Sequence, residues 1–167
     1  MRIAIAVAAL AILAACGKPP APAGQEANAV SAEAPTAPAP ALTDAQKKAL
    51  LADLPAAYQN ADLDNGQAKF AICKTCHNVA KGAGNMTGPG LYEVFGRKAG
   101  TSSGFVYSDG LKALGITWDA ASLDKWITNP HAMVPGTKMT YIGMSDPKDR
   151  TDLIAYLKTV TSPPPAG

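Results

Sequence analysis

Two cysteines three residues apart, followed at once by a histidine, constrain this chain more than any other feature; they stand in the run Cys73-Lys74-Thr75-Cys76-His77. On one helical turn the two sulfur atoms face the same way, so that each can form a thioether bond to a haem vinyl group. The next residue then places an imidazole nitrogen under the iron. The spacing therefore predicts covalent attachment of a c-type haem through Cys73 and Cys76, with His77 as an iron ligand.

Two other kinds of site share the Cys-x-x-Cys spacing. A structural zinc site needs four ligands, and outside the motif the chain has only one histidine, His131, and one cysteine, Cys16. A thioredoxin-like redox site needs a βαβ context, and no strand-rich run flanks the motif. Haem attachment is therefore the preferred interpretation.

The N-terminus has the form of a bacterial export signal. Arg2 supplies a short positive segment, and Ile3–Leu13 is an apolar stretch too short to span a bilayer. The stretch ends in Leu-Ala-Ala-Cys, which resembles a lipobox, so we expect a signal peptide over residues 1–15 and lipidation of Cys16 after its removal. The alternative is an ordinary cleavage after small residues, with Cys16 a bystander. Export agrees with a c-type haem, because bacteria attach that group outside the cytoplasm.

Composition divides the rest of the chain. Residues 16–41 are dominated by Ala, Pro and Gly, with no aromatic residue, and such a segment cannot offset its ordering entropy by burial. We expect a disordered tether there, with a reach of about 75 Å when fully extended. Residues 42–162 have the length of one domain, and residues 163–167 form a disordered tail. The formal charge of +2 and the scattered basic residues argue against a nucleic-acid partner.

Helical signals dominate residues 42–162 and strand alternation is nearly absent, so we expect an all-α fold of three to five helices with long loops. A domain with so many loops gains stability from a large apolar cofactor in its core. The expected helices are one capped by Asp62 and leading into the motif, one over residues 118–129 capped by Thr117 and ended by Pro130, one beginning at Asp146-Pro147, and an additional one over Asp44–Leu54 that Pro55 breaks.

The iron needs a sixth ligand from elsewhere in the chain. The candidates are Met86, Met133, Met139, Met144 and His131. A methionine is more often a core residue than a ligand, so position must decide. Met139 follows Val-Pro-Gly-Thr-Lys, in which proline and glycine fix a tight loop that can present one side chain to a buried iron. A thioether ligand favours the ferrous state and raises the reduction potential.

Many further motifs follow in one order along residues 64–160. They are Gly66 and Phe70, Cys73–His77, Lys81-Gly82, Thr87-Gly88-Pro89, Phe95-Gly96-Arg97-Lys98, Gly104-Phe105-Val106-Tyr107, Gly115-Ile116-Thr117-Trp118, Asn129-Pro130, Pro135–Met139 and Asp152–Lys158. This series resembles the class I (mitochondrial-type) cytochromes c, here in a membrane-tethered bacterial form. The resemblance implies the all-α class I fold wrapped around one covalently bound haem c that cycles between ferric and ferrous iron.

The resemblance also implies how the iron is held. Met139 would be the distal ligand, so that His77 and Met139 bind the iron from its two sides. The carbonyl of Pro89 would accept a hydrogen bond from Nδ1 of His77, which fixes the ring and raises its basicity. Thr137, in the same motif as Met139, would be a further haem contact.

Other residues would surround the propionates by the same resemblance. Tyr107 and Trp118 would hydrogen-bond a buried propionate, with Arg97 nearby as a compensating charge. The alternative for Tyr107 and Trp118 is a role as ordinary core aromatics.

The chain departs from the family pattern at several positions. Leu111 stands where the family usually has an asparagine near the propionate. Trp126 stands where it has a tyrosine beside the methionine sulfur, and an indole can donate a hydrogen bond but not accept one. The family's ring of lysines is largely missing, with Ile72, Gly84, Ser145 and Asp146 at positions that are often basic. Electrostatic steering to an acidic partner should therefore be weak.

We expect an electron carrier and not an enzyme. It would be lipid-anchored through Cys16 on the periplasmic side of a bacterial membrane, and would take single electrons from a quinol-oxidising complex to a terminal oxidase or reductase. The alternatives are a cytochrome subunit of a periplasmic dehydrogenase and a haem peroxidase. A peroxidase needs an open iron position, which Met139 would close.

Overall fold

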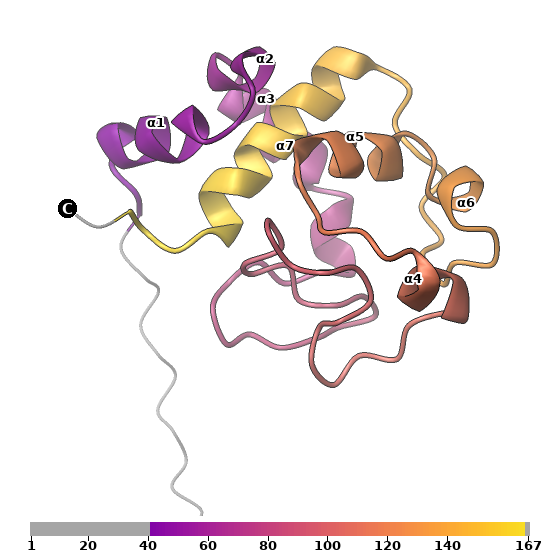
Figure 1. Ribbon diagram of the computed structural model, residues 1–167. Helices are drawn as coiled ribbons and strands as arrows, with labels where there is room; N and C mark the ends of the chain where they lie inside the picture. Colours follow the sequence, from indigo (N-terminus) through magenta and orange to yellow (C-terminus); the bar gives the residue numbers. More distant parts are fainter. Residues whose placement is uncertain (1–40, 166–167) are drawn as a thin grey trace, which may run out of the picture. The chain divides into compact units, whose positions relative to one another are not determined.

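A computed structural model describes residues 41–165, and every regular element in that range is a helix (Figure 1). The expected signal peptide, Cys16 and the tether up to residue 40 lie outside the described residues, as do residues 166–167. The elements in chain order are α1 (Asp44–Ala52), α2 (Ala56–Gln59), α3 (Leu63–Phe70), the 3-10 turn η1 (Cys73–Thr75), α4 (Asp109–Ala113), α5 (Ala120–Thr128), α6 (Pro130–Met133) and α7 (Pro147–Thr161).

The all-α prediction is confirmed. Within residues 41–165 the β pairing is limited to an isolated bridge between Lys98 and Thr117. More helices are present than the expected three to five because α2, α4 and α6 are single turns of four or five residues. Such short turns have no apolar period that a sequence pattern could show.

Helix α3 begins where the sequence predicts. Asp62 has an extended backbone, and its carboxylate accepts hydrogen bonds from the backbone N–H groups of Asp64 and Asn65 at 3.1 and 3.0 Å. These bonds satisfy two of the donors that a helix leaves free at its start. The cap fixes where α3 starts, and α3 leads directly to η1 and the Cys-x-x-Cys-His motif.

Helix α7 also begins as predicted, and it is the central helix of the domain. The carboxylate of Asp146 accepts a hydrogen bond from the N–H of Asp149 at 3.0 Å, and Pro147 occupies the first helical position. A proline is tolerated there because its missing N–H would have had no partner within the helix. Four other helices pack against α7, namely α1, α2, α3 and α5.

A glycine lets α3 and α7 cross at close range. A Cβ atom at Gly66 would overlap the backbone carbonyl of Asp152 and would lie 2.7 Å from Cβ of Tyr156. One turn further along α3, the rings of Phe70 and Tyr156 have centroids 5.8 Å apart and are tilted by 45°. The absent side chain of Gly66 therefore sets the distance between the two helices.

A buried carboxylate ties the same two helices together. The side chain of Asp152 is 3% exposed. It accepts hydrogen bonds from the N–H of Asp62 at 3.0 Å, the amide of Asn65 at 2.7 Å and the ammonium of Lys148 at 2.6 Å. Burial raises the pKa of Asp152, but the hydrogen bonds from Lys148, Asn65 and Asp62 lower it more, so that the net pKa lies below the ordinary value of 3.8. Asp152 is therefore ionised at neutral pH.

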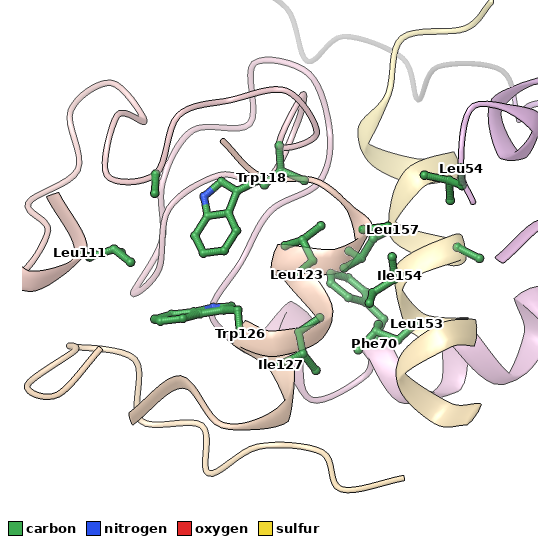
Figure 2. Close-up of a cluster of buried hydrophobic side chains, with 14 of the residues drawn as sticks. Leu54, Phe70, Leu111, Trp118, Leu123, Trp126, Ile127, Leu153, Ile154 and Leu157 are labelled. Atoms are coloured by element: carbon green, nitrogen blue, oxygen red, sulfur yellow. The ribbon is translucent and has the colours of Figure 1, made fainter. Parts of the chain in front are cut away.

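The buried side chains form one core with two parts that meet at α5 (Figure 2). One part surrounds α7, and the other contains two indoles whose planes are tilted by 57°. The ring centroids of Trp118 and Trp126 are 5.7 Å apart. The first part includes Leu54, Phe70, Leu153, Ile154 and Leu157, the second includes Leu111, Trp118 and Trp126, and Leu123 and Ile127 of α5 lie between them.

Helices α1 and α2 form a hairpin on α7. Leu51 and Leu54 are buried in the main core and Leu50 is also buried, and the ammonium of Lys158 lies 3.6 Å from the carboxylate of Asp53. The additional helix expected over Asp44–Leu54 is therefore present as α1. It ends two residues earlier, at Ala52 with Asp53 as its C-cap, and Pro55 is the N-cap of α2.

Helix α5 begins two residues later than expected, because its cap is Asp119 and not Thr117. The Asp119 carboxylate accepts the N–H of Ser122 at 2.7 Å, and the hydroxyl of Ser122 accepts the N–H of Asp119 at 2.8 Å, so that a reciprocal capping box forms. Trp118 consequently precedes the helix, and its backbone N–H donates to the backbone carbonyl of Arg97 at 2.9 Å. The indole of Trp118 is buried in the core.

Candidate functional site

A cavity of about 520 Å³ lies between α5 and the long loops. Its volume is within the range of about 300–1,000 Å³ that small-molecule and cofactor sites occupy. The walls come from five parts of the chain: residues 72–77, 87–89, 105–111, 137–142 and Trp126 of α5. Most of the lining side chains are apolar or aromatic, which suits a large apolar ligand.

Both cysteines of the motif and its histidine line this cavity. In η1 the backbone N–H groups of Cys76 and His77 both donate to the carbonyl of Cys73, at 3.1 and 3.0 Å. This tight turn brings the three side chains to the same wall. Burial raises the pKa of the Cys73 thiol to about 11, so the thiol stays protonated at neutral pH and is a poor nucleophile.

The imidazole of His77 has a defined orientation and a free nitrogen. Its Nδ1 lies 2.8 Å from the carbonyl oxygen of Pro89. A carbonyl can only accept, so Nδ1 carries the proton and Nε2 keeps its lone pair. Burial lowers the pKa of His77, with the hydrogen bond to Pro89 acting in the opposite direction. The ring is therefore neutral at neutral pH, which is the form that binds a metal.

Gly88 fits closely against this ring. A Cβ atom at Gly88 would overlap the imidazole and would lie 2.7 Å from Nδ1 of His77. The N–H of Gly88 also donates to the carbonyl of Cys76 at 2.8 Å. The loop that carries Pro89 is thus held against the motif by backbone contacts that only a glycine permits.

Met139 lines the same cavity from a loop far along the chain. The N–H of Thr137 donates to the carbonyl of Val134 at 3.1 Å, and the N–H of Met139 donates to the Thr137 hydroxyl at 3.3 Å. The ammonium of Lys138 donates to the carbonyl of Val106 at 2.9 Å. These bonds fix the loop and direct one thioether into the cavity.

The other candidates for a sixth ligand do not line the cavity. Met133 and Met144 are half-buried and pack against the core, and Met86 is 44% exposed. His131 is exposed on α6, which Asn129 caps and Pro130 begins. Pro130 therefore ends α5 as expected and also starts a further turn, α6, that no sequence signal predicts.

A set of buried aromatic and aliphatic side chains closes the side of the cavity near α5. Tyr107, Leu111 and Trp126 are buried and line it, and the rings of Tyr107 and Phe105 meet edge to face with centroids 4.8 Å apart. Trp118 is buried but is not among the lining residues; it packs behind Trp126.

Arg97 is half-buried and uses its guanidinium on the backbone. It donates to the carbonyl of Gly90 at 2.9 Å and to that of Tyr92 at 3.2 Å. Burial lowers the pKa of Arg97, while Tyr107 and Glu93 raise it. Arg97 does not line the cavity but holds the loop that follows Pro89.

Several lining residues were not predicted individually. Phe105 stands inside the Gly104–Tyr107 motif, which predicts no role for it, and Leu111 and Ile72 are predicted only as departures from the family pattern. Tyr141 and Ile142 carry no motif, and their one signal is that they follow Met139 directly.

The donor set fits a covalent haem and does not fit a metal cluster. Two thiols, a neutral imidazole with a free Nε2 and a thioether line one largely apolar cavity of cofactor size. In residues 41–165 no group of three or more His, Cys, Asp or Glu side chains is placed to hold a metal ion. The helical fold and this site together define a c-type haem protein.

Comparisons with known proteins agree with a c-type haem protein. The family model "Cytochrome c" matches residues 63–161, and the chain belongs to this family. It is 48% identical to cytochrome c2 of Rhodomicrobium vannielii over 103 residues, which cover 62% of this chain and 82% of that protein. It is 46% identical to cytochrome c of Ginkgo biloba over 90 residues, 54% of this chain and 80% of that one.

A solved structure supports the class I fold. Cytochrome cH from Methylobacterium extorquens matches with a TM-score of 0.56 and 49% identity, over 59% of this chain and 99% of that one. The cofactor is one covalent haem c with iron, and the protein is an electron carrier and not an enzyme. Across residues 41–165 no helix combines the length and apolar composition that a membrane span requires.

Proposed function

We propose that Cys73 and Cys76 bind the haem covalently and that His77 and Met139 are the two axial ligands of its iron. The observation that carries this proposal is that all four side chains line one cavity, although Met139 comes from a distant loop. The bound haem supplies reversible one-electron chemistry. The hydrogen bond from His77 to Pro89 orients the imidazole and raises its basicity.

The remaining predicted haem contacts differ in how closely they would approach the haem. Tyr107 and Trp126 would touch the haem directly, since both line the cavity, and Thr137 would do so while holding the Met139 loop. Trp118 would reach a propionate only past Trp126, against which it packs. Arg97 would act through the loop that it binds.

The covalent bonds are tested by extraction. After treatment with acid acetone, the haem should stay with the denatured chain, because two thioether bonds hold it. Replacement of Cys73 and Cys76 by serine should leave a chain that releases all its haem. Free haem in the organic phase from the wild-type protein would contradict the assignment.

The distal ligand is tested by three matched substitutions. Met139→Ala should abolish the weak long-wavelength band of the ferric protein and lower the reduction potential, on the order of 100 mV or more, since the axial ligand is a main determinant of haem potential. Met133→Ala and Met144→Ala remove methionines that pack on the core outside the cavity, so they should keep the band. Loss of the band in either of these, with its retention in Met139→Ala, would reassign the ligand.

We also propose that the domain of residues 42–162 carries electrons between membrane complexes on the periplasmic side of a bacterial membrane. A quinol-oxidising complex would be the donor and a terminal oxidase or reductase the acceptor. The export signal predicted for residues 1–15 and the similarity to bacterial cytochromes c2 support this placement. Outer-sphere electron transfer needs no catalytic acid, base or nucleophile, and no residue is assigned such a role. Pull-down from solubilised membranes, with reduced spectra of the partners, tests it.

Cys16 is proposed to carry the lipid anchor, with residues 17–41 as the tether. Buried methylenes contribute about 0.8 kcal/mol each, so two or three acyl chains hold a small domain firmly. Cys16→Ala should move the cytochrome from washed membranes to the soluble fraction without loss of haem. A wild-type protein that is soluble, with a free thiol or an N-terminus beyond Cys16, would show that the lipobox match is accidental.

A further inference from the structure

The segment between Met139 and α7 is fixed near its far end and not along its length. The N–H of Met144 donates to the carbonyl of Ile127 in α5 at 2.9 Å. At Gly143, which has a φ of 113°, a Cβ atom would overlap the carbonyl of Thr128 at the end of the same helix. In the described part of the chain, the four residues that follow Met139 make no backbone-to-backbone hydrogen bond. The course of the segment therefore depends on how its far end is seated on α5.

Arg150 of α7 holds this far end of the segment. Its Nη1 atom donates to the carbonyls of Met144 and Ser145 at 2.9 and 2.8 Å, and its Nε atom donates to the carboxylate of Asp124 in α5 at 2.7 Å. An arginine suits this position because its guanidinium presents five N–H donors in one fixed plane. One side chain thus joins α5, α7 and the segment that follows Met139.

The ion pair of Asp124 and Arg150 is partly shielded from water. The side chain of Arg150 is 11% exposed and that of Asp124 is 32% exposed. Fully exposed ion pairs contribute little, because water and salt compete for both groups, whereas a partly buried charge-assisted hydrogen bond is stronger and orients its partners. Without the carboxylate, the guanidinium would lose the acceptor that fixes its position from α5. Its bonds to the carbonyls of Met144 and Ser145 would then no longer tie the segment to that helix.

We propose that Asp124 and Arg150 are positioning residues for Met139, because their ion pair seats the following segment on α5 and so limits how often the thioether leaves the cavity. The hydrogen bond from the N–H of Met139 to the Thr137 hydroxyl fixes the chain before the thioether, and the ion pair fixes the chain after it. A side chain whose backbone is held on both sides opens less often than one held on a single side. This inference rests on the proposed assignment of Met139 as an axial ligand and adds the residues that keep it in place.

Binding of imidazole to the ferric holoprotein tests the proposal. Imidazole can take the sixth position only after Met139 has moved away, so at saturating imidazole the loss of the weak long-wavelength band follows the rate of that movement. Asp124→Asn keeps the shape of the side chain and removes its charge, and the rate should rise about tenfold because a charge-assisted hydrogen bond is lost. Asp124→Glu keeps a carboxylate, and its rate should stay within about threefold of the wild type. An unchanged rate in Asp124→Asn would overturn the proposal.

Asp149→Asn is the matched control, since it makes the same substitution in the residue next to Arg150. The carboxylate of Asp149 pairs with Lys69 of α3 at 2.7 Å, the same distance as in the pair of Asp124 and Arg150. Its side chain therefore joins α7 to α3 and not to the segment after Met139, and the rate should stay within about twofold of the wild type. Urea denaturation measures the loss of stability in both variants. Acceleration that follows this loss of stability in both would overturn the proposal, because general loosening of the fold would then explain it.

The two positioning residues should also act as a unit. Arg150→Lys keeps the charge but loses the planar fork, and the rate should rise about tenfold. Adding Asp124→Asn to Arg150→Lys should raise it less than about threefold further, because the two changes remove the same interaction; full multiplication of the two effects would overturn the shared role. Retention of the long-wavelength band in Met139→Ala would overturn the axial assignment and this inference together. Loss of the band in that variant, with a wild-type rate in Asp124→Asn, would refute the positioning role alone.

Discussion

Replacement of Gly66 by alanine should destabilise the domain by forcing α3 and α7 apart. The added Cβ would overlap the carbonyl of Asp152 and would stand 2.7 Å from Cβ of Tyr156. Carbon atoms in contact normally lie about 3.5–4.0 Å apart, so the two backbones must separate by about 1 Å. Neither neighbour can turn away, because one is a backbone group and the other is the first carbon of its side chain.

The size of the effect follows from two opposing contributions. Overpacking of a tight contact costs about 1–3 kcal/mol, and more when backbone must move. Alanine recovers about 1 kcal/mol of helix propensity relative to glycine. Separation also stretches the hydrogen bonds from Asp62 and Asn65 to Asp152, which cross the same interface. We expect a net loss of about 2 kcal/mol in the free energy of unfolding.

Urea and thermal denaturation of the holoprotein measure this loss. A decrease of about 2 kcal/mol corresponds to a fall in Tm of roughly 8 °C for a domain of this size. Gln67→Ala is the matched control, since it changes the adjacent exposed residue of α3 and adds no atom at the crossing. A Gly66→Ala protein as stable as the control would refute the reasoning from the helix separation.

Three further predictions concern the site and its supports. Gly88→Ala should lower the haem-to-protein ratio measured by absorbance, because its Cβ would displace the His77 ring; an unchanged ratio and spectrum would contradict this. Asp152→Asn should cost about 2 kcal/mol at pH 7. The folded pKa of Asp152 is below 3.8, so the stability that its carboxylate contributes is fully present above pH 3.8. This contribution is lost as the pH falls through the folded pKa, so the free energies of unfolding of the two proteins should converge in acid. Asn85→Ala should cost about 1–2 kcal/mol in urea denaturation, since its side chain makes two loop hydrogen bonds of 2.8 and 2.9 Å; a neutral effect would show that the loops are held otherwise.

The sequence predicts best where a residue acts on its own neighbours. Asp62 and the Asp146-Pro147 pair are local signals, and both cap the helices expected of them. The motif at Cys73–His77 is equally local, since its meaning depends on a spacing of three residues. The class I fold follows because many such signals occur in one order.

Prediction from the sequence fails where the interacting residues are distant in the chain, or where two neighbouring residues could both fill the same role. Thr117 and Asp119 are both acceptable caps, and the reciprocal bond with Ser122 decides for Asp119. Arg97 has the charge to approach a propionate, yet its guanidinium binds two carbonyls in its own loop. The burial of Asp152 depends on residues almost ninety positions away, which no local pattern reveals.

The position of α7 at the end of the chain has a consequence for the order of assembly. Helices α1, α2, α3 and α5 all pack on α7, so a chain emerging from synthesis or export lacks their common partner until residues 147–161 appear. Cys73 and Cys76 follow α3, and α3 lacks its contacts to Asp152 and Tyr156 until α7 is present. The helix that all four others share is therefore also the last helix of the domain to be made.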